Sequence, residues 1–175
     1  CLRANDISEV DGILNGTTNY ILTKMFNEGM SFDAALKEAQ EKGYAERDPS
    51  ADVDGIDTCR KLSILSAIAF GELIPPAKIH TEGIRGVTPK DVALAEKLGA
   101  SIKLIGRAVR HDGKLCATVE PMLVPKANPL SGISDVYNGV MISGNAVGDV
   151  MFYGRGAGRY PTAGAMISDV CAIMT

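Results

Sequence analysis

The chain has 175 residues, of which 46% are hydrophobic, and its 18 Lys and Arg against 21 Asp and Glu give a formal net charge of −3. This size fits one domain with a sizeable core or one domain of a longer protein, and the absence of a basic block argues against nucleic-acid binding. Because no apolar run reaches the roughly 18 to 20 residues that cross a bilayer and the first residues show no signal-peptide pattern, we expect a cytoplasmic protein that does not contact membranes.

The first part of the chain shows helical patterns. Residues 7–14 read as an extended segment that leads into the polar turn Asn15–Asn19, whose residue types commonly cap helices. Apolar residues then recur at helical spacing as far as Gly29, and a second helix is predicted between Ser31 as its N-cap and Gly43.

The most informative stretch runs from Gly43 to Lys61 and combines an acidic loop with the start of an apolar helix. That helix is predicted to continue to about Phe70. The stretch carries five carboxylates, namely Glu46, Asp48, Asp52, Asp54 and Asp57. Since few cations lie nearby, we expect these carboxylates to converge on a site that a cationic or hydroxylated small molecule completes.

The helical spacing also predicts where the charges of this helix point. At about 100° per residue, Asp57 and Lys61 fall on one stripe with Ile64 and Ile68. The opposite side carries Cys59, Ser63 and Ser66. We therefore expect the ion pair to lie within the apolar arc, either lining a cleft or forming a buried structural salt bridge.

The second part of the chain changes from helical to strand periodicity. Thr88–Asp91 combines a cap, a proline and an acidic residue, and predicts the start of a helix that ends at Gly99. Strands follow near residues 102–109, 115–124 (interrupted at Pro121), 136–143 and 147–153, with tight turns at 112–113 and 144–145. Helices followed by antiparallel strands predict an α+β fold with helices packed on one face of a mixed, mostly antiparallel sheet.

A glycine-rich turn containing Gly154, Gly156 and Gly158 precedes the last predicted element, an amphipathic helix from Thr162 onward. Its apolar face is formed by Ala163, Met166, Ile167, Val170 and Cys171. Bare backbone amides at a helix start attract anions, but a dinucleotide fingerprint opens a βαβ unit, and the chain ends too soon for one. The turn therefore reads as a hinge that passes close to a neighbouring domain and its cofactor.

Metal and disulfide chemistry are not indicated. The four cysteines, Cys1, Cys59, Cys116 and Cys171, show no CxxC spacing, and the two histidines are isolated from them. Reduced thiols and no metal site are the expectation. The opening on Cys1 and the helical character of the last residues lead us to expect a fragment of a longer chain.

Three segments together resemble homoserine dehydrogenases. They are 12–21 (GILNGTTNYI), 43–57 (GYAERDPSADVDGID) with Lys61, and 153–158 (YGRGAG) with 161–163 (PTA), and they occur in the family's order. The resemblance implies an enzyme that interconverts L-aspartate 4-semialdehyde and L-homoserine with NAD(P), on the path to threonine and methionine.

The resemblance also implies roles for individual residues. Lys61 and Asp57 match the catalytic lysine and aspartate of one helix, and Glu46 and Asp52 match substrate-binding carboxylates. Tyr44, Asn15 and Thr17, in the signature segments, complete the expected substrate site. A second lysine of the nucleotide domain is an alternative carrier of the proton.

The same resemblance bounds the domain. Residues 1–175 correspond to the substrate-binding and dimerisation domain, so we expect a homodimer and little activity from this chain alone. NAD(P) is expected to bind mostly to an N-terminal domain absent from the chain, with Gly154, Gly156 and Gly158 as lesser contacts.

Two other function classes were weighed. A dehydrogenase that uses a cysteine thiolate on acyl-phosphates needs a histidine base in reach, and neither His80 nor His111 lies in such a motif. A dimerisation or small-molecule-binding module without catalysis also agrees with the sequence, and ligand binding without turnover distinguishes it.

Overall fold

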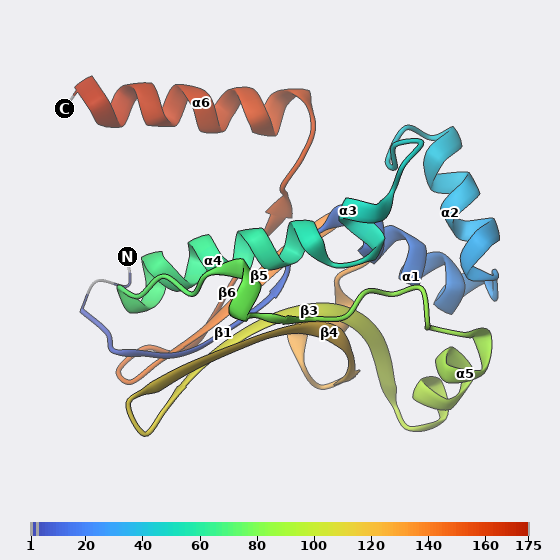
Figure 1. Cartoon of the computed structure of the whole chain (residues 1–175), viewed down its shortest axis with the longest axis horizontal. Helices are drawn as coiled ribbons and strands as arrows, with labels where there is room; N and C mark the ends of the chain where they lie inside the picture. The colour runs from blue at the N-terminus through green and yellow to red at the C-terminus, as the bar shows by residue number, and fades with distance from the viewer. Residues whose placement is uncertain (1, 3, 175) are drawn as a thin grey trace.

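The computed structural model describes residue 2 and residues 4–174, and its centre is one six-stranded sheet with the order β2-β4-β3-β1-β5-β6 (Figure 1). The strands are β1 (Ile7–Ile13), β2 (His80–Thr81), β3 (Ala100–His111), β4 (Lys114–Pro125), β5 (Tyr137–Gly144) and β6 (Gly148–Arg155). All neighbouring pairs are antiparallel except β2 with β4. The α+β class with a mixed, mostly antiparallel sheet is therefore confirmed.

The helices are α1 (Gly16–Glu28), α2 (Phe32–Glu41), α3 (Ser50–Val53), α4 (Ile56–Phe70), α5 (Pro89–Lys97) and α6 (Arg159–Met174), with short 3-10 turns η1 (Pro76–Lys78) and η2 (Pro129–Gly132). The predicted caps are confirmed. The Ser31 side chain accepts from Ala34 N, and Thr88 with Asp91 forms a reciprocal capping box. The short elements α3, β2, η1 and η2 were not predicted, because each is too brief to show a period.

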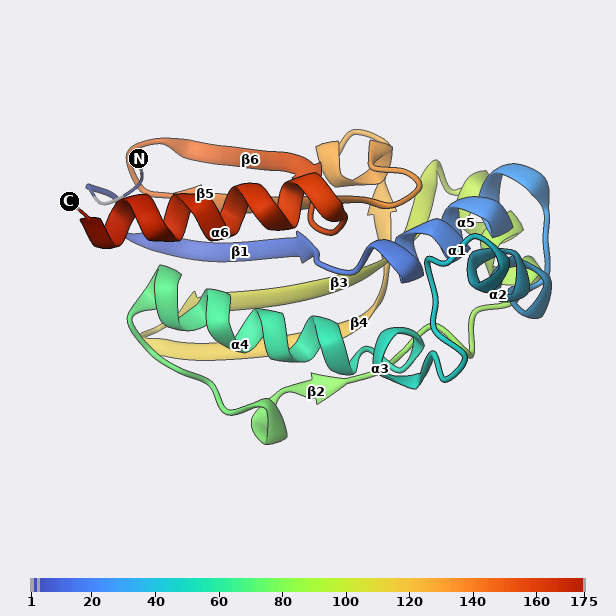
Figure 2. The ribbon, with the colours of Figure 1, turned by 90° about the horizontal axis from the view of Figure 1, so that it is seen from above.

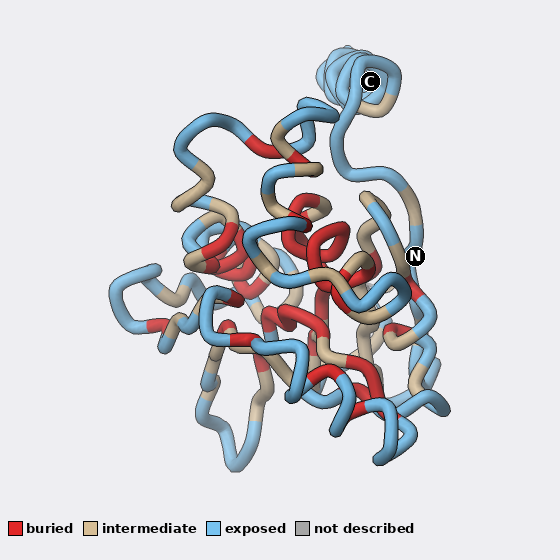
Figure 3. The backbone as a smooth tube through the Cα atoms, turned by 90° about the vertical axis from the view of Figure 1, so that its right-hand side faces the viewer, coloured by how far each residue is buried: buried red, intermediate tan, exposed pale blue. Residues whose placement is uncertain are grey.

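The core lies between the sheet and the helices that cover one face of it. Viewed from above, α4 runs along β3 and β4, while α1 continues from the end of β1 (Figure 2). Residues with almost no exposed surface from both layers meet there, including Leu62 of α4, Ile21 and Met25 of α1, and Val119 of β4. The burial pattern shows the same concentration of buried residues in the middle of the molecule (Figure 3).

The predicted orientation of α4 was wrong. Ile64 and Ile68 are 58% and 76% exposed, whereas Ser63 and Ser66 are buried. The hydroxyl of Ser63 donates to the Ile74 carbonyl and that of Ser66 to the Leu62 carbonyl. Because these small side chains are satisfied internally, they bury without an unpaired polar group, and the ion-pair stripe faces outward.

The predicted interruption of a strand at Pro121 was also wrong. β4 is continuous, and Pro121 lies opposite Leu104 of β3. β2 pairs only with Thr118 and Val119, so β4 is an edge strand at Pro121. Proline has no backbone N–H, and on an edge strand no neighbouring strand requires a hydrogen bond from it.

The last helix, α6, stands apart from the rest of the fold. It begins at Arg159 instead of Thr162, and Figures 1 and 3 show it carried away from the sheet on the segment after β6. No described residue of α6 is buried, so its apolar face is not part of the core. No helix in the described part of the chain is long and apolar enough to cross a membrane.

The cysteines are distributed between core and surface. Cys59 is buried in α4 and Cys116 is exposed on β4. Cys171 is exposed on α6. Cys1 lies outside the described residues.

Candidate functional site

The site is organised around Asn15, which lies between the end of β1 and the start of α1. Its side-chain oxygen accepts a hydrogen bond from Thr18 N at 2.9 Å, so it is the N-cap of α1. Its amide nitrogen donates to Asp52 Oδ1 at 2.7 Å and to Asp57 Oδ2 at 2.9 Å. One buried amide therefore begins the helix and holds two carboxylates together.

The Asp57–Lys61 pair forms the outer part of the site. Lys61 Nζ lies 2.7 Å from Asp57 Oδ2 and donates to the Leu14 carbonyl at 3.0 Å. The two side chains are 49% (Lys61) and 31% (Asp57) exposed, so the pair is open to solvent and is not a sealed structural bridge. An ammonium has three N–H groups, and within the described part of the chain two are engaged, which leaves one to donate to a ligand oxygen.

The five carboxylates of the acidic loop do not all converge, which corrects the expectation from sequence. Asp54 pairs with the guanidinium of Arg85, and Asp48 accepts from the backbone N–H and hydroxyl of Ser50. The bonds from Ser50 hold the pKa of Asp48 below its ordinary value. Among the described residues, no group of three or more His, Cys, Asp or Glu is arranged to hold a metal ion.

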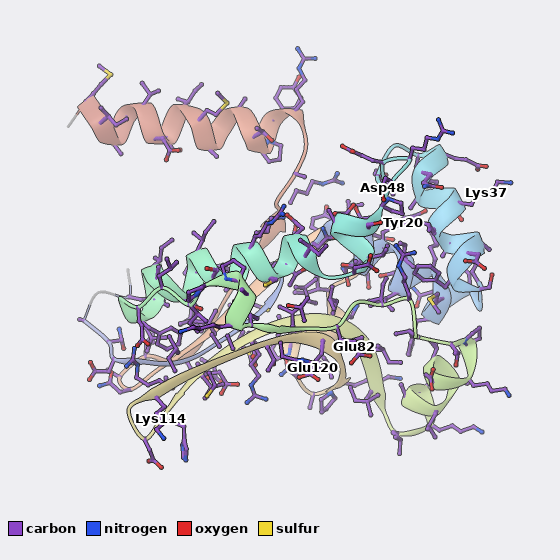
Figure 4. All side chains as sticks on the ribbon, in the orientation of Figure 1. Tyr20, Lys37, Asp48, Glu82, Lys114 and Glu120 are labelled. Atoms are coloured by element: carbon purple, nitrogen blue, oxygen red, sulfur yellow. The ribbon has the colours of Figure 1, made fainter. Side chains whose placement is uncertain are left out.

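The remaining predicted substrate residues surround this centre at different depths. Thr17 is buried, and its hydroxyl donates to the Tyr44 carbonyl at 2.6 Å, so it fixes the acidic loop against α1. The Tyr44 ring is 45% exposed and meets Tyr20 edge to face at 5.1 Å. Glu46 is exposed, and the loop backbone at Glu46 accepts from Gln40. Figure 4 shows this loop, marked by Asp48, between α2 and α3, with Tyr20 beneath it.

An open apolar surface adjoins Lys61. One helical turn further along α4, Leu65 and Ile68 line a hollow of about 550 Å³ whose opposite wall includes Val10 of β1 and Ile142 of β5. This hollow lies between α4 and the sheet. On the outward face of α4 the ion pair is followed by the exposed Ile64 and Ile68, as expected of a surface that another part of a protein or a ligand covers.

The glycine-rich turn lies at the same end of the sheet as Asn15. Gly154 is near the end of β6, and Gly156 and Gly158 lie in the segment that connects β6 to α6. Gly156 N donates to Asn138 Oδ1, and Asn138 Nδ2 donates to the Ile13 carbonyl, two residues before Asn15. The turn and the carboxylate site therefore lie at the same end of the sheet, joined through Asn138.

The roles of Leu14 and Asn138 were not predicted from the sequence. The Leu14 carbonyl is a backbone group and carries no signal in its side chain. Asn138 follows Tyr137 at the start of a strand, and asparagine is uncommon in strands. An asparagine in a strand was the one feature of the sequence that pointed to a special role for Asn138.

Comparison with known proteins identifies the family of this chain. The family model described as homoserine dehydrogenase matches residues 1–171. The chain belongs to the homoserine dehydrogenase family. A homoserine dehydrogenase of Synechocystis is 49% identical over 99% of this chain, and the crystal structure of one from Thiobacillus denitrificans superposes with a TM-score of 0.94 at 46% identity over 97% of this chain.

The match covers only part of these homoserine dehydrogenases. The chain spans 41% of the Synechocystis protein and 39% of the Thiobacillus denitrificans structure. A hyperthermophilic archaeal homoserine dehydrogenase mutant, solved in complex with NADPH, matches 97% of this chain with 34% identity and a TM-score of 0.80. The present chain spans 48% of the archaeal protein.

Proposed function

We propose that residues 1–175 are the substrate-binding and dimerisation domain of an NAD(P)-dependent homoserine dehydrogenase. The enzyme interconverts L-aspartate 4-semialdehyde and L-homoserine for threonine and methionine synthesis, in the cytoplasm. One observation supports this most: the Asp57–Lys61 pair is open to solvent, yet Asn15 and the Leu14 carbonyl fix its position. A pair present only for helix stability needs no such support from outside its helix.

Within this proposal Lys61 and Asp57 are the catalytic residues. The free N–H of Lys61 donates to the oxygen that changes between carbonyl and alcohol, where an ammonium stabilises developing negative charge. Asp57 holds Lys61 in position through the 2.7 Å contact. Lys61 also takes part in the proton transfer that accompanies the reaction.

The substrate is an amino acid, so its ammonium needs anionic partners. Asp52 is held by Asn15 beside Asp57, and the exposed Glu46 lies on the loop above α3. We assign these two carboxylates to the ammonium. Tyr44 and Thr17, joined through the Tyr44 carbonyl, form the adjacent wall.

NAD(P) supplies the hydride acceptor or donor when it is bound. The exposed Gly156 and Gly158 and the half-buried Gly154 fit a contact with a dinucleotide, because a side chain at Gly154 would meet open space. The NADPH complex of the archaeal relative agrees with this cofactor class. Most of the cofactor site is assigned to a domain outside these residues.

The uncovered face of the sheet supports a homodimer. Helices cover one face, and the other presents Met151 and Tyr153, which are 39% and 57% exposed, beside Met141. Apolar side chains of this size on an open sheet suit contact with a second copy.

The proposal is tested with the full-length protein that contains this chain. Purified wild type is expected to reduce NAD(P)⁺ in the presence of L-homoserine, whereas Lys61→Met and Asp57→Asn lose about a hundredfold or more of kcat, as removal of a group that stabilises transition-state charge commonly does. Lys37 points outward from α2 (Figure 4) and forms an exposed pair with Glu41, so Lys37→Met is the matched control.

The 175-residue chain alone provides the second arm. It is expected to bind L-homoserine without turnover, since it lacks most of the cofactor site. Wild-type activity that survives Lys61→Met unchanged contradicts the assigned roles, and ordinary turnover by the isolated chain contradicts the domain assignment.

A further inference from the structure

Asn138 connects two segments that the proposed function uses separately. Its Nδ2 donates to the Ile13 carbonyl at 3.0 Å, and its Oδ1 accepts from Gly156 N at 3.1 Å. The first contact reaches the end of β1 and the second reaches the glycine-rich turn. A single half-buried side chain therefore joins the two backbones.

The β1 end of this connection leads directly to the candidate catalytic residues. Ile13 is followed by Leu14, whose carbonyl accepts from Lys61, and by Asn15, which holds Asp57. A shift of this three-residue stretch moves the acceptor of Lys61 and the donor to Asp57 together. The position of the turn relative to Lys61 thus depends on Asn138.

The other end explains why residue 156 is glycine. A Cβ at Gly156 would lie 2.6 Å from Asn138 Oδ1 and 3.2 Å from its Cγ, but 3.8 Å from its Cβ. A side chain at this position would therefore force the amide group of Asn138 to shift, away from the geometry of its two hydrogen bonds. Gly156 is therefore needed for its close approach to Asn138, apart from any contact with a cofactor.

The segment that carries Asn138 is itself held firmly. Asn19 Nδ2 donates to the carbonyls of Asp135 and Tyr137, on both sides of Val136, and Lys103 Nζ donates to Asn19 Oδ1 at 3.1 Å. The Tyr137 ring stacks on Tyr153 at 5.1 Å. These contacts anchor the start of β5 to α1 and β6, so Asn138 projects from a rigid element, as a positioning residue requires.

We propose that Asn138 is a positioning residue, which fixes the glycine-rich turn against the backbone that supports Lys61 and Asp57, and so aligns the cofactor-facing turn with the substrate site. This inference rests on the proposed function. It assigns Gly156 a role through Asn138, in addition to any direct contact with NAD(P).

The test is a double-mutant cycle in the full-length protein. Asn138→Ala and Gly156→Ala are each expected to reduce kcat by about ten- to hundredfold, since small misplacement of reacting groups costs that much. In the Asn138→Ala background the added Cβ meets ordinary contact distance, so Gly156→Ala is expected to cost less than about twofold further. Equal costs of Gly156→Ala in both backgrounds overturn the proposal.

Asn145 provides a matched control at the opposite end of the same β5–β6 hairpin. It also bridges two segments with both amide atoms, accepting from Asp6 N and donating to Asp6 Oδ2. Asn145→Ala is expected to leave kcat within about twofold, because it removes a comparable bridge far from the site. An equal loss of kcat in Asn145→Ala and Asn138→Ala shows a general effect on folding and overturns the proposal.

A readout independent of activity separates this inference from the proposed function. Amide hydrogen exchange around Gly156 is expected to accelerate about tenfold or more in Asn138→Ala, while exchange in α1 stays unchanged. If the wild type is inactive but exchange accelerates in Asn138→Ala, the proposed function is rejected, whereas the connection between Asn138 and the glycine-rich turn is supported. Active wild type without any acceleration in the variant rejects the positioning role.

Discussion

The Asn15 amide nitrogen lies 2.9 Å from Asp57 Oδ2, although 42 positions separate the two residues. The same amide contacts Asp52, and its oxygen caps α1. Correct formation of α1 and correct placement of the candidate catalytic carboxylate are therefore linked through one side chain. This linkage can be separated experimentally, because capping and clamping use different atoms.

Asn15→Ser separates the two roles. Serine also caps helices well, so α1 should lose only a few tenths of a kcal/mol, whereas Asn15→Ala should cost about 1 kcal/mol more through loss of the cap. Both variants remove the donor to Asp52 and Asp57 and should lower kcat/KM for homoserine by about tenfold or more. Thermal unfolding and steady-state kinetics measure the two effects, and full activity of Asn15→Ser contradicts the clamp.

Gly83→Ala should destabilise the folded chain where Gly83 packs against the backbone of Val53 and Asp54. A Cβ at Gly83 would lie 2.1 Å from the Val53 carbonyl oxygen and 2.5 Å from Asp54 Cα, both backbone atoms that cannot rotate away. We expect a loss of about 1–3 kcal/mol or more in the free energy of unfolding. Gly86→Ala, where nothing lies within 4 Å, is the control and should be close to neutral in urea denaturation.

Lys103 should make the free energy of unfolding depend on pH in the alkaline range. Burial lowers its pKa from 10.5 to about 8, despite the nearby Asp135, and its ammonium donates to Asn19 and the Ile133 carbonyl. Between pH 8 and 10.5 the unfolded chain binds more protons, so stability should rise with pH by on the order of 3 kcal/mol from this group.

Lys103→Met should remove that rise, and the exposed Lys97→Met should retain it. Denaturation of the 175-residue chain at several pH values measures both slopes. Parallel slopes for wild type and Lys103→Met contradict the assignment of the shift to Lys103.

Asp11 should have the opposite effect on the acidic side. Burial and the neighbouring Glu9 raise its pKa to about 6, with Asp149 adding to the rise and Arg107 opposing it. The folded chain binds more protons between pH 3.8 and 6, so stability should fall as pH rises through this window. Asp11→Asn should therefore stabilise the chain at pH 7.5 by on the order of 3 kcal/mol, with the gain disappearing toward pH 4.

Asp112→Asn, in the exposed hairpin turn, is the control for this prediction. Its side chain is 88% exposed, and asparagine tolerates the positive φ of 49° at this position. Its stability should match that of wild type across the same pH range. An Asp11→Asn variant that is no more stable than wild type at pH 7.5 rules out a destabilising charge at Asp11.

Local chemistry made much of the fold predictable. The caps at Ser31 and Thr88 and the tight turn at residues 112–113 depend on neighbours within a few positions, and the structure confirms all three. The run of antiparallel strands after α5 was predicted from the change to strand periodicity, whereas the position of β1 between β3 and β5 was not. Periods and caps are visible in a sequence because the interacting groups are close along the chain.

Tertiary structure alone decided which face of α4 is buried and which carboxylates meet. Hydrophobicity predicted that Ile64 and Ile68 point inward, but the Ile74 carbonyl beyond α4 satisfies Ser63, the Leu62 carbonyl one turn earlier satisfies Ser66, and both serines are buried. Arg85 removes Asp54 from the acidic cluster from 31 positions away. The sequence by itself determined the longer helices and strands and the family, whereas long-range hydrogen bonds and ion pairs, which no local pattern encodes, determined the geometry of the site.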